Sequence, residues 1–332
     1  GVSIPVVSRA LSSDIIQNRT VAAETAFKII SCAKSLGYQR RRPHIQRRAV
    51  GVIGVFVPEN HTSLMLDLLT SISIAANEAN TPIHFYPAAD EKSYSHFVRN
   101  YANSTRNLGV IAYYPPDPED VRFFMKMYED LKKNDAQIIM IHNNVPPDFP
   151  ASSVQIDNYH GGFLAGEYLG EMQLEDYFGI GFLSDRSFSY YRNERIRGFC
   201  DGLAAHKVHP TLFQLQGKLT ESQNPKKALD SILKIIEWKA DVPIGLFIDG
   251  DLDAIMASRY LGTKGIVVGK QVKLIGYDDL ASGLTTYPKL TTIHSPFAEM
   301  GQIAMRKLIN LMKGYKENSE ILKPTLVIRE TA

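Results

Sequence analysis

Basic side chains gather at the start of the chain, where they could neutralise the charge of phosphate groups. Residues 1–48 hold nine Arg or Lys against two acidic residues, a net charge of +7, whereas the remaining 284 residues carry a net charge of −5. Basic residues that meet phosphates displace bound counterions, which gives sequence-independent affinity for nucleic acid. A small basic segment on a mildly acidic body favours nucleic-acid binding. On charge alone, a solvated basic arm remains the alternative.

The sequence carries no pattern typical of a catalyst. It has no G-x-S-x-G, no P-loop and no G-x-G-x-x-G after a strand. Four histidines are scattered without metal-ligand spacing: His142, His160, His206 and His294. Two isolated cysteines fit a reducing cytoplasm better than a disulfide framework. We therefore expect no enzyme, no cofactor and no metal site.

The sequence predicts two sets of structural elements that would position functional side chains, one in the basic segment and one in the rest of the chain. In the basic segment, residues 3–11 predict a helix capped by Ser3, and residues 21–36 predict a second helix. The run RRRPHIQRR then marks a domain boundary, which predicts a head at 1–48 and a body at 49–332.

The body alternates apolar runs with amphipathic segments. The strand candidates are VGVIGVFV, PIHFY, GVIAYY, AQIIMI, SVQI, GIGFL, LFQLQ, IGLFI, VKLIGY, LTTI and TLVIR. Continuous β-branched runs predict parallel strands buried on both faces and covered by helices. So many βα units exceed one comfortable open sheet, which leaves two similar lobes or one eight-fold barrel.

The head resembles the DNA-reading part of the LacI/GalR family of transcription regulators. GVSIPVVSRAL is similar to the recognition element A-G-V-S-x-x-T-V-S-R-V-L, and VAAETAFKIISCAKSLGYQ to the following V-x-x-E-T…A-x-x-L-G-Y helix. The resemblance implies a helix in the major groove, with Ile4, Pro5 and Arg9 facing bases and Ser3 and Ser8 facing the backbone. The family's first helix has no counterpart, because this sequence opens at the turn.

The hinge of that family usually reads A-R-x-L, with a leucine that wedges into the minor groove. Here the stretch reads PHIQRR, and Arg47 stands at the usual distance from Tyr38. Ile45 would be the wedge if the register shifts, so both residues are predicted DNA contacts.

The resemblance continues along the body. VQIDNYHGGFLAGEYL, RIRGF, FIDGDLDAIMA, VKLIGYDDLASG and YPKLTTIHSPF each match a family landmark. It implies an α/β fold of two-lobed, periplasmic-binding-protein-like parallel sheets after a small all-α helix-turn-helix head, which removes the barrel. We place the N-lobe at about 49–173 and 296–318, and the C-lobe at about 174–294 and 319–332. These limits put the crossings between lobes near 172–176, 293–296 and 315–322.

Position-by-position match implies five residues at a ligand between the lobes: Asp157, Arg195, Asp251, Asp278 and Phe297. Tyr113 is a sixth candidate, chosen from several aromatic residues that could lie at the site. Asp251 follows Gly250, where the family has an Asn. Carboxylates, a guanidinium fork and aromatic faces suit a neutral carbohydrate. The long loop between the head helices hints at a galactoside. The aspartates of GYDD could instead cap the next helix, and Arg192 or Arg197 could pair with Glu194.

These features predict a cytoplasmic repressor that binds a palindromic operator as a homodimer and responds to a small effector, inducer or corepressor. The dimer face is expected around Leu64–Ala75 and Ser282–Tyr287. The sequence shows no secretory signal or membrane span. The alternative is a transport-linked sugar-binding protein, which would share the body but lack the head.

Overall fold

The protein divides into two compact units, Gly1–Ala49 and Val50–Ala332, one residue from the predicted boundary. The computed structural model describes residues 2–10, 21–35, 51–57, 63–86, 91–101, 108–113, 118–141, 145, 149–183, 190–216, 229–230, 234 and 242–332. Each unit is described by itself.

The first unit contains two described helices, α1 (Ile4–Ala10) and α3 (Ala23–Ser35). The carbonyl of Ser3 accepts from the N–H groups of Val6 and Val7, so α1 begins where the sequence predicted. The two helices contact each other, and Ala10 and Ile29 are buried. The predicted second helix is two residues too long at its start.

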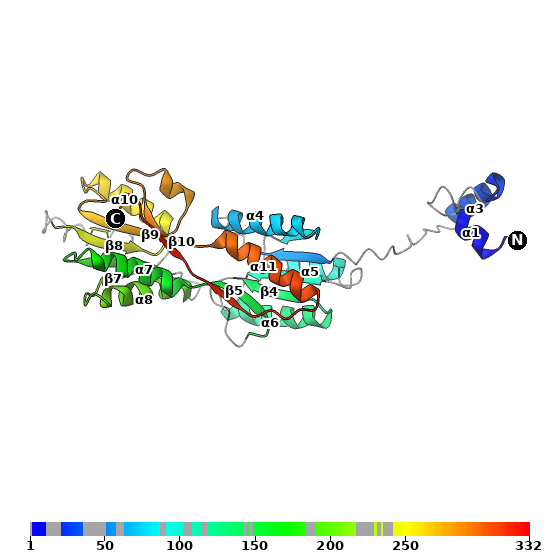
Figure 1. Ribbon diagram of the computed structural model, residues 1–332, viewed down its shortest axis with the longest axis horizontal. Coiled ribbons are helices and arrows are strands. Elements are labelled where there is room, and N and C mark those ends of the chain that lie inside the picture. The colour runs from blue at the N-terminus through cyan, green and yellow to red at the C-terminus, as the bar shows by residue number, and fades with distance from the viewer. Residues whose placement is uncertain are drawn as a thin grey trace. The chain divides into compact units, whose positions relative to one another are not determined.

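The second unit contains two six-stranded sheets, each with helices on both faces (Figure 1). The first sheet has the order β11-β5-β4-β3-β1-β2 and is parallel throughout. Its strands are β1 (Val52–Phe56), β2 (Ile83–Tyr86), β3 (Leu108–Tyr113), β4 (Gln137–Ile141), β5 (Ser152–Ile156) and β11 (Glu320–Leu322). We call this sheet and its helices the first lobe.

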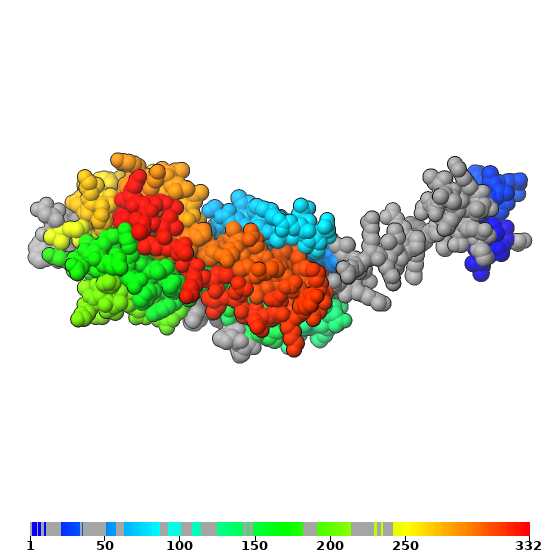
Figure 2. Space-filling view, in the orientation of Figure 1, coloured from blue at the N-terminus to red at the C-terminus, as the bar shows by residue number. Residues whose placement is uncertain are grey.

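Four helices cover the first sheet: α4 (Ser63–Glu78), α5 (Glu91–Tyr101), α6 (Pro118–Lys133) and α11 (Phe297–Met312). Leu68 of α4 and Met300 of α11 belong to one apolar cluster, and Phe97 of α5 and Leu131 of α6 belong to a second. The space-filling view shows α4, in cyan, beside α11, in orange, on the surface (Figure 2).

The second lobe is built on a sheet of order β12-β10-β9-β8-β6-β7. Its strands are β6 (Tyr177–Leu183), β7 (Thr211–Gln216), β8 (Ile244–Ile248), β9 (Val272–Asp278), β10 (Thr291–His294) and β12 (Thr325–Val327), the last antiparallel. The helical elements of this lobe whose bounds the structure describes are α7 (Asn158–Glu171), α8 (Tyr190–Ala204), α10 (Asp251–Thr263) and the 3-10 turn η1 (Ala281–Leu284). Helices α7 and α8 pack on one face, and α10 packs on the other.

The chain crosses between the lobes at 156–158, 294–297 and 322–325. The middle crossing lies at its predicted place. The first differs from the predicted 172–176, because α7 packs on α8 and so belongs wholly to the second lobe. The third lies beyond the predicted 315–322, because β11 pairs with β5 of the first lobe.

Among the described helices, none is both long enough and apolar enough to span a lipid bilayer.

Candidate ligand-binding site

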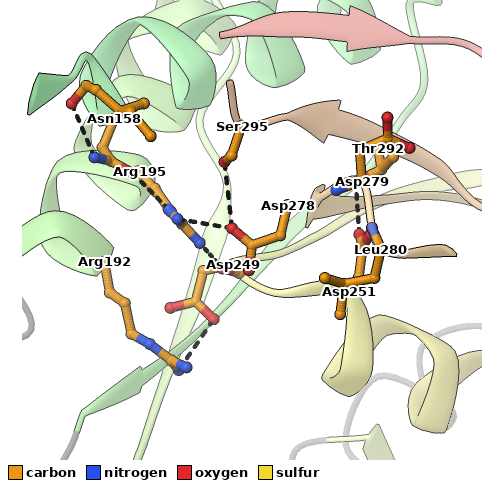
Figure 3. A network of polar contacts seen from close by, with 11 residues as sticks. Asn158, Arg192, Arg195, Asp249, Asp251, Asp278, Asp279, Leu280, Thr292 and Ser295 are labelled. Atoms are coloured by element: carbon orange, nitrogen blue, oxygen red, sulfur yellow. Dashed lines mark hydrogen bonds and ion pairs between the residues drawn. The ribbon is translucent and has the colours of Figure 1, made fainter. Parts of the chain in front are cut away.

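Arg195 occupies the centre of a polar network in the second lobe (Figure 3). Its Nε donates to Oδ1 of Asn158 at 2.8 Å, its Nη1 to the backbone carbonyl of Asp249 at 2.7 Å, and its Nη2 to Oδ1 of Asp278 at 2.9 Å. Only 4% of the residue is exposed. The guanidinium therefore links three segments that lie far apart in the sequence, and the fork is fixed in one orientation.

Glycines let α7 and α8 approach closely enough for this network to form. A Cβ at Gly162 would overlap the backbone carbonyl of Arg195, and one at Gly198 would overlap the backbone carbonyl of Tyr159. Since neither glycine has a Cβ, the two helix backbones touch, and the start of α7 comes within reach of the Arg195 side chain.

The charge on Arg195 is maintained despite its burial. Burial alone would lower the pKa of Arg195, but Asp278, Tyr277 and Tyr191 act in the opposite direction, and the pKa lies above its ordinary value. The guanidinium carbon also lies 3.6 Å from the ring centroid of Tyr277 and 5.1 Å from that of Tyr191. A charged fork between aromatic faces suits a polar ligand with an apolar face.

Asp278 ends β9 with the unusual backbone angle φ of 110°. Besides Arg195, it accepts from Oγ of Ser295 at 3.4 Å, and its side chain is 20% exposed. Its neighbour Asp279, with φ of 57°, binds Arg329 at 2.5 Å and His294 at 3.0 Å. Neither aspartate caps η1, whose N-cap residue is Leu280 without a side-chain bond, so the capping alternative is wrong.

Asp157 and Tyr113 lie close to this network. Asp157 caps α7 by accepting from the His160 N–H at 2.9 Å, and it is one of the groups that raise the pKa of Tyr277, after burial. Burial also raises the pKa of Tyr113, and Tyr191 and Asp278 raise it further. Because Tyr113 ends β3 of the first lobe, residues from both lobes meet around the Arg195–Asp278 pair.

Asp251 and Phe297 make their contacts within the protein. Asp251 is 1% exposed and both of its carboxylate oxygens bind protein groups, Thr292 and the backbone N–H of Leu280. Phe297 is 6% exposed and belongs to the apolar core of the first lobe. Four of the six predicted ligand residues are therefore together, and these two serve the protein interior in this structure.

The network contains polar residues that the sequence reasoning did not select: Asn158, Asp249 and Arg192. Asp249 is fully buried and its Oδ1 lies 3.5 Å from Nη1 of Arg192. Arg192 stands three residues before Arg195, so i, i+3 spacing on α8 would have placed both guanidinium groups on one face. The suggested surface pair holds for Arg197, which binds Glu194 at 2.5 Å, and not for Arg192.

The predicted DNA contacts are only partly described. Ser3, which precedes α1, is exposed, and Ile4, the first residue of α1, is 85% exposed. The side chains of Pro5, Ser8 and Arg9, and all of Ile45 and Arg47, lie outside the described residues. Over the described ranges, no three His, Cys, Asp or Glu side chains group as a metal site would need.

Residues 177–332 match the model of a periplasmic binding protein-like domain. The whole chain is 25% identical to the HTH-type transcriptional repressor PurR of Edwardsiella ictaluri, over 94% of that relative. The Lac repressor dimer bound to operator and the anti-inducer ONPF is 21% identical, with a TM-score of 0.68 over 100% of this chain and 96% of the other. A LacI-family regulator from Enterococcus faecium with bound ribose is 21% identical, with a TM-score of 0.67 over 85% and 98%.

The fold is thus that of a periplasmic-binding-protein-like domain. Over its whole length the chain is similar to HTH-type transcriptional repressors, and its fold is similar to that of Lac repressor and LacI-family regulators. These PurR relatives are transcriptional repressors, not enzymes.

Proposed function

We propose that this protein is a repressor whose affinity for a palindromic operator is controlled by a small neutral carbohydrate held at the Arg195–Asp278 pair. The proposal rests on the bonded Arg195–Asp278 pair of the second lobe, with the Asp278 side chain 20% exposed and Tyr113 of the first lobe near enough for both residues to shift its pKa. A ligand at this place touches both lobes, so it can favour one arrangement of the lobes over another.

The charges around the site favour a neutral ligand. Arg195 is paired with Asp278, and Arg192 with Asp249, so neither guanidinium offers an uncompensated charge to an anion. Asp157 and Asp278 each use one carboxylate oxygen, and no described group bonds to the other oxygen of either residue. Such oxygens accept from ligand hydroxyl groups, and adjacent hydroxyls with an apolar ring face are typical of sugars.

A thermal-shift screen of the full chain tests the ligand class. The panel contains galactose, lactose, ribose, cellobiose, hypoxanthine and guanine, each added at millimolar concentration. A sugar that raises the Tm of the parent protein but not of Arg195→Lys supports the proposal, because ligand binding to the native state stabilises it by mass action. Stabilisation by a purine alone would overturn the carbohydrate assignment.

The homodimer is part of the same proposal, and exposed apolar side chains on two helices support it. Leu66 and Ile74, eight residues apart on α4, are 65% and 52% exposed. Leu252 and Met256, four residues apart on α10, are 52% and 40% exposed. Beside α4, a groove of about 830 Å³ runs along α11. Apolar helix faces of this kind are typical of protein interfaces.

The second predicted part of the dimer face points the same way, since Leu284 is 51% and Tyr287 is 97% exposed. We place the dimer in the cytoplasm, where the operator is.

The rival function, a transport-linked sugar-binding protein, predicts sugar binding without DNA binding. Selection of duplex DNA from a random pool by the full chain separates the two: enrichment of a palindrome supports the repressor, and failure to enrich any sequence supports the rival.

A further inference from the structure

The buried carboxylate of Asp251 joins three segments of the second lobe. Its Oδ1 accepts from Oγ1 of Thr292 in β10 at 2.6 Å, and its Oδ2 accepts from the backbone N–H of Leu280 at 2.7 Å. The Thr292 hydroxyl in turn accepts from the N–H of Asp279 at 3.4 Å. Figure 3 shows this group beside the Arg195 network.

The glycine at position 276 leaves room for this carboxylate. Asp251 is 1% exposed, and a Cβ at Gly276 of β9 would overlap its Oδ1. A buried polar group is stable only when it is bonded, and here both oxygens are. The carboxylate therefore serves the chain around it and has no access to a ligand.

Asp251 bonds to the residue that follows two aspartates with a strained backbone. Asp278 and Asp279 both have positive φ, a conformation that is strained for residues other than glycine. Such a conformation persists where surrounding contacts enforce it. Asp251 fixes the residue that follows them, and Thr292 fixes Asp279.

We propose that Asp251 is a positioning residue, which holds Asp278 against Arg195 by anchoring the chain at Leu280 and Thr292. The inference rests on the proposed role of the Arg195–Asp278 pair in ligand binding. It replaces the expected direct contact between Asp251 and the ligand.

If Asp251 positions Asp278, the ionisation of Asp251 changes the Arg195 contact with pH. A purely structural role would not produce this pH dependence. Burial raises the pKa of Asp251 to about 8, the Asp278 and Asp279 carboxylates raise it too, and the Thr292 and Leu280 hydrogen bonds lower it. Other charged groups nearby are Asp253 on the same helix, and His294 and Arg329, which bind Asp279. When Asp251 ionises, its charge opposes Asp278, so the Arg195 contact should change near pH 8.

The test uses the arginine side-chain ¹⁵N–¹H spectrum of the full, ligand-free chain, with the Arg195 Nε signal assigned by its loss in Arg195→Lys. Thr292→Val removes the hydroxyl that binds Asp251. Thr291→Val is the matched control, because its hydroxyl lies in the same strand, is equally buried, and binds Arg329 and Ala332 instead. We expect Thr292→Val to move the Arg195 Nε signal and Thr291→Val to leave it unchanged.

A pH titration of the same signal completes the test. The Arg195 Nε signal of the parent protein and of His294→Asn should shift near pH 8. In Asp251→Asn this shift should be absent, and the signal should stay at the position that the parent protein shows at low pH. An amide can still accept from Leu280 and bind Thr292, so Asp251→Asn should fold.

An unmoved Arg195 signal in Thr292→Val, or a transition that survives in Asp251→Asn, would overturn the inference. Because no ligand is used, these outcomes do not depend on the proposed carbohydrate. Failure of the sugar screen with a positive spectrum would reject only the ligand proposal.

Discussion

Arg195 combines charge, burial and three fixed hydrogen bonds within one residue. Removing it would leave the Asp278 carboxylate and the Asn158 amide without this partner. Replacing it by Lys would keep the charge but not the planar fork, which alone can reach three acceptors at once. The proposed ligand binding therefore depends on the side chain of Arg195.

We predict that Arg195→Ala lowers the free energy of unfolding by about 3 kcal/mol, because breaking a buried ion pair leaves one charge uncompensated. The measurement is urea unfolding of the parent and variant proteins. Arg197→Ala is the control, two residues along the same helix. Since Arg197 is 61% exposed in its pair with Glu194, its loss should cost at most about 1 kcal/mol. Equal losses in the two variants would contradict the central position of Arg195.

Asp251 makes the stability of the protein depend on pH in a specific direction. The unfolded carboxyl loses its proton near pH 4, whereas the folded one keeps it until about pH 8. Between these values the folded state binds the extra proton, so the stability contributed at low pH is lost as the pH rises toward 8.

We therefore expect the parent protein to lose stability relative to Asp251→Asn between pH 5 and pH 8, by on the order of a few kcal/mol. Urea unfolding of both proteins across that range measures the difference. A difference that stays constant with pH would show that Asp251 is ionised throughout.

At the scale of elements, the packing of α7 on α8 determines where the Arg195 side chain lies. We expect Gly162→Ala to destabilise the protein by about 1–3 kcal/mol, because its Cβ would overlap the Arg195 carbonyl and push the helices apart. Ligand stabilisation should weaken as well.

The matched control is Gly262→Ala on α10, where a Cβ would meet nothing within 4 Å. In an open helical position the change to Ala should stabilise by about 0.5–1 kcal/mol. Thermal unfolding compares the two variants. If both stabilise, α7 and α8 have room to spare, and their close contact does not position Arg195.

Elements with a clear period were predictable from the sequence. All eleven strand candidates of the body are strands. Central runs such as IGLFI are buried on both faces, whereas the strands β2 and β12 at the sheet edges are partly exposed. β11 was missed because Glu320–Leu322 is only three residues long and is formed by pairing with β5. The lobe of α7 was predicted wrongly, because the sequence does not show that α7 packs on α8.

The candidate site was predictable only in part. Arg195, Asp278 and Asp157 were found by their match to family motifs, and Tyr113 was one of several candidate aromatic residues. Asp251 matched a motif equally well but faces inward, since its direction depends on Leu280 and Thr292 folding around it. Sequence alone cannot show which oxygens of a carboxylate the protein itself uses.

At the scale of the whole molecule, the proposed dimer joins two ligand-sensing bodies. We predict that Ile74→Asp converts the dimer to a monomer, because a carboxylate would be buried in an apolar interface. Sedimentation at micromolar concentration measures the mass. Lys126→Asp on α6, which covers the other face of the first sheet, should leave the dimer intact. A dimer that persists in Ile74→Asp would place the interface elsewhere.

The central claim is that a ligand at the Arg195–Asp278 pair controls operator binding. Its most direct test is fluorescence anisotropy with the palindrome selected by the full chain, measured with and without the stabilising sugar. We expect the sugar to change the Kd of the parent protein by about tenfold or more, as coupling energies of 1–3 kcal/mol imply, and to leave that of Arg195→Lys unchanged. The claim would be contradicted if the sugar left the operator Kd of the parent protein unchanged. It would also be contradicted if the sugar changed the Kd of Arg195→Lys as much as that of the parent.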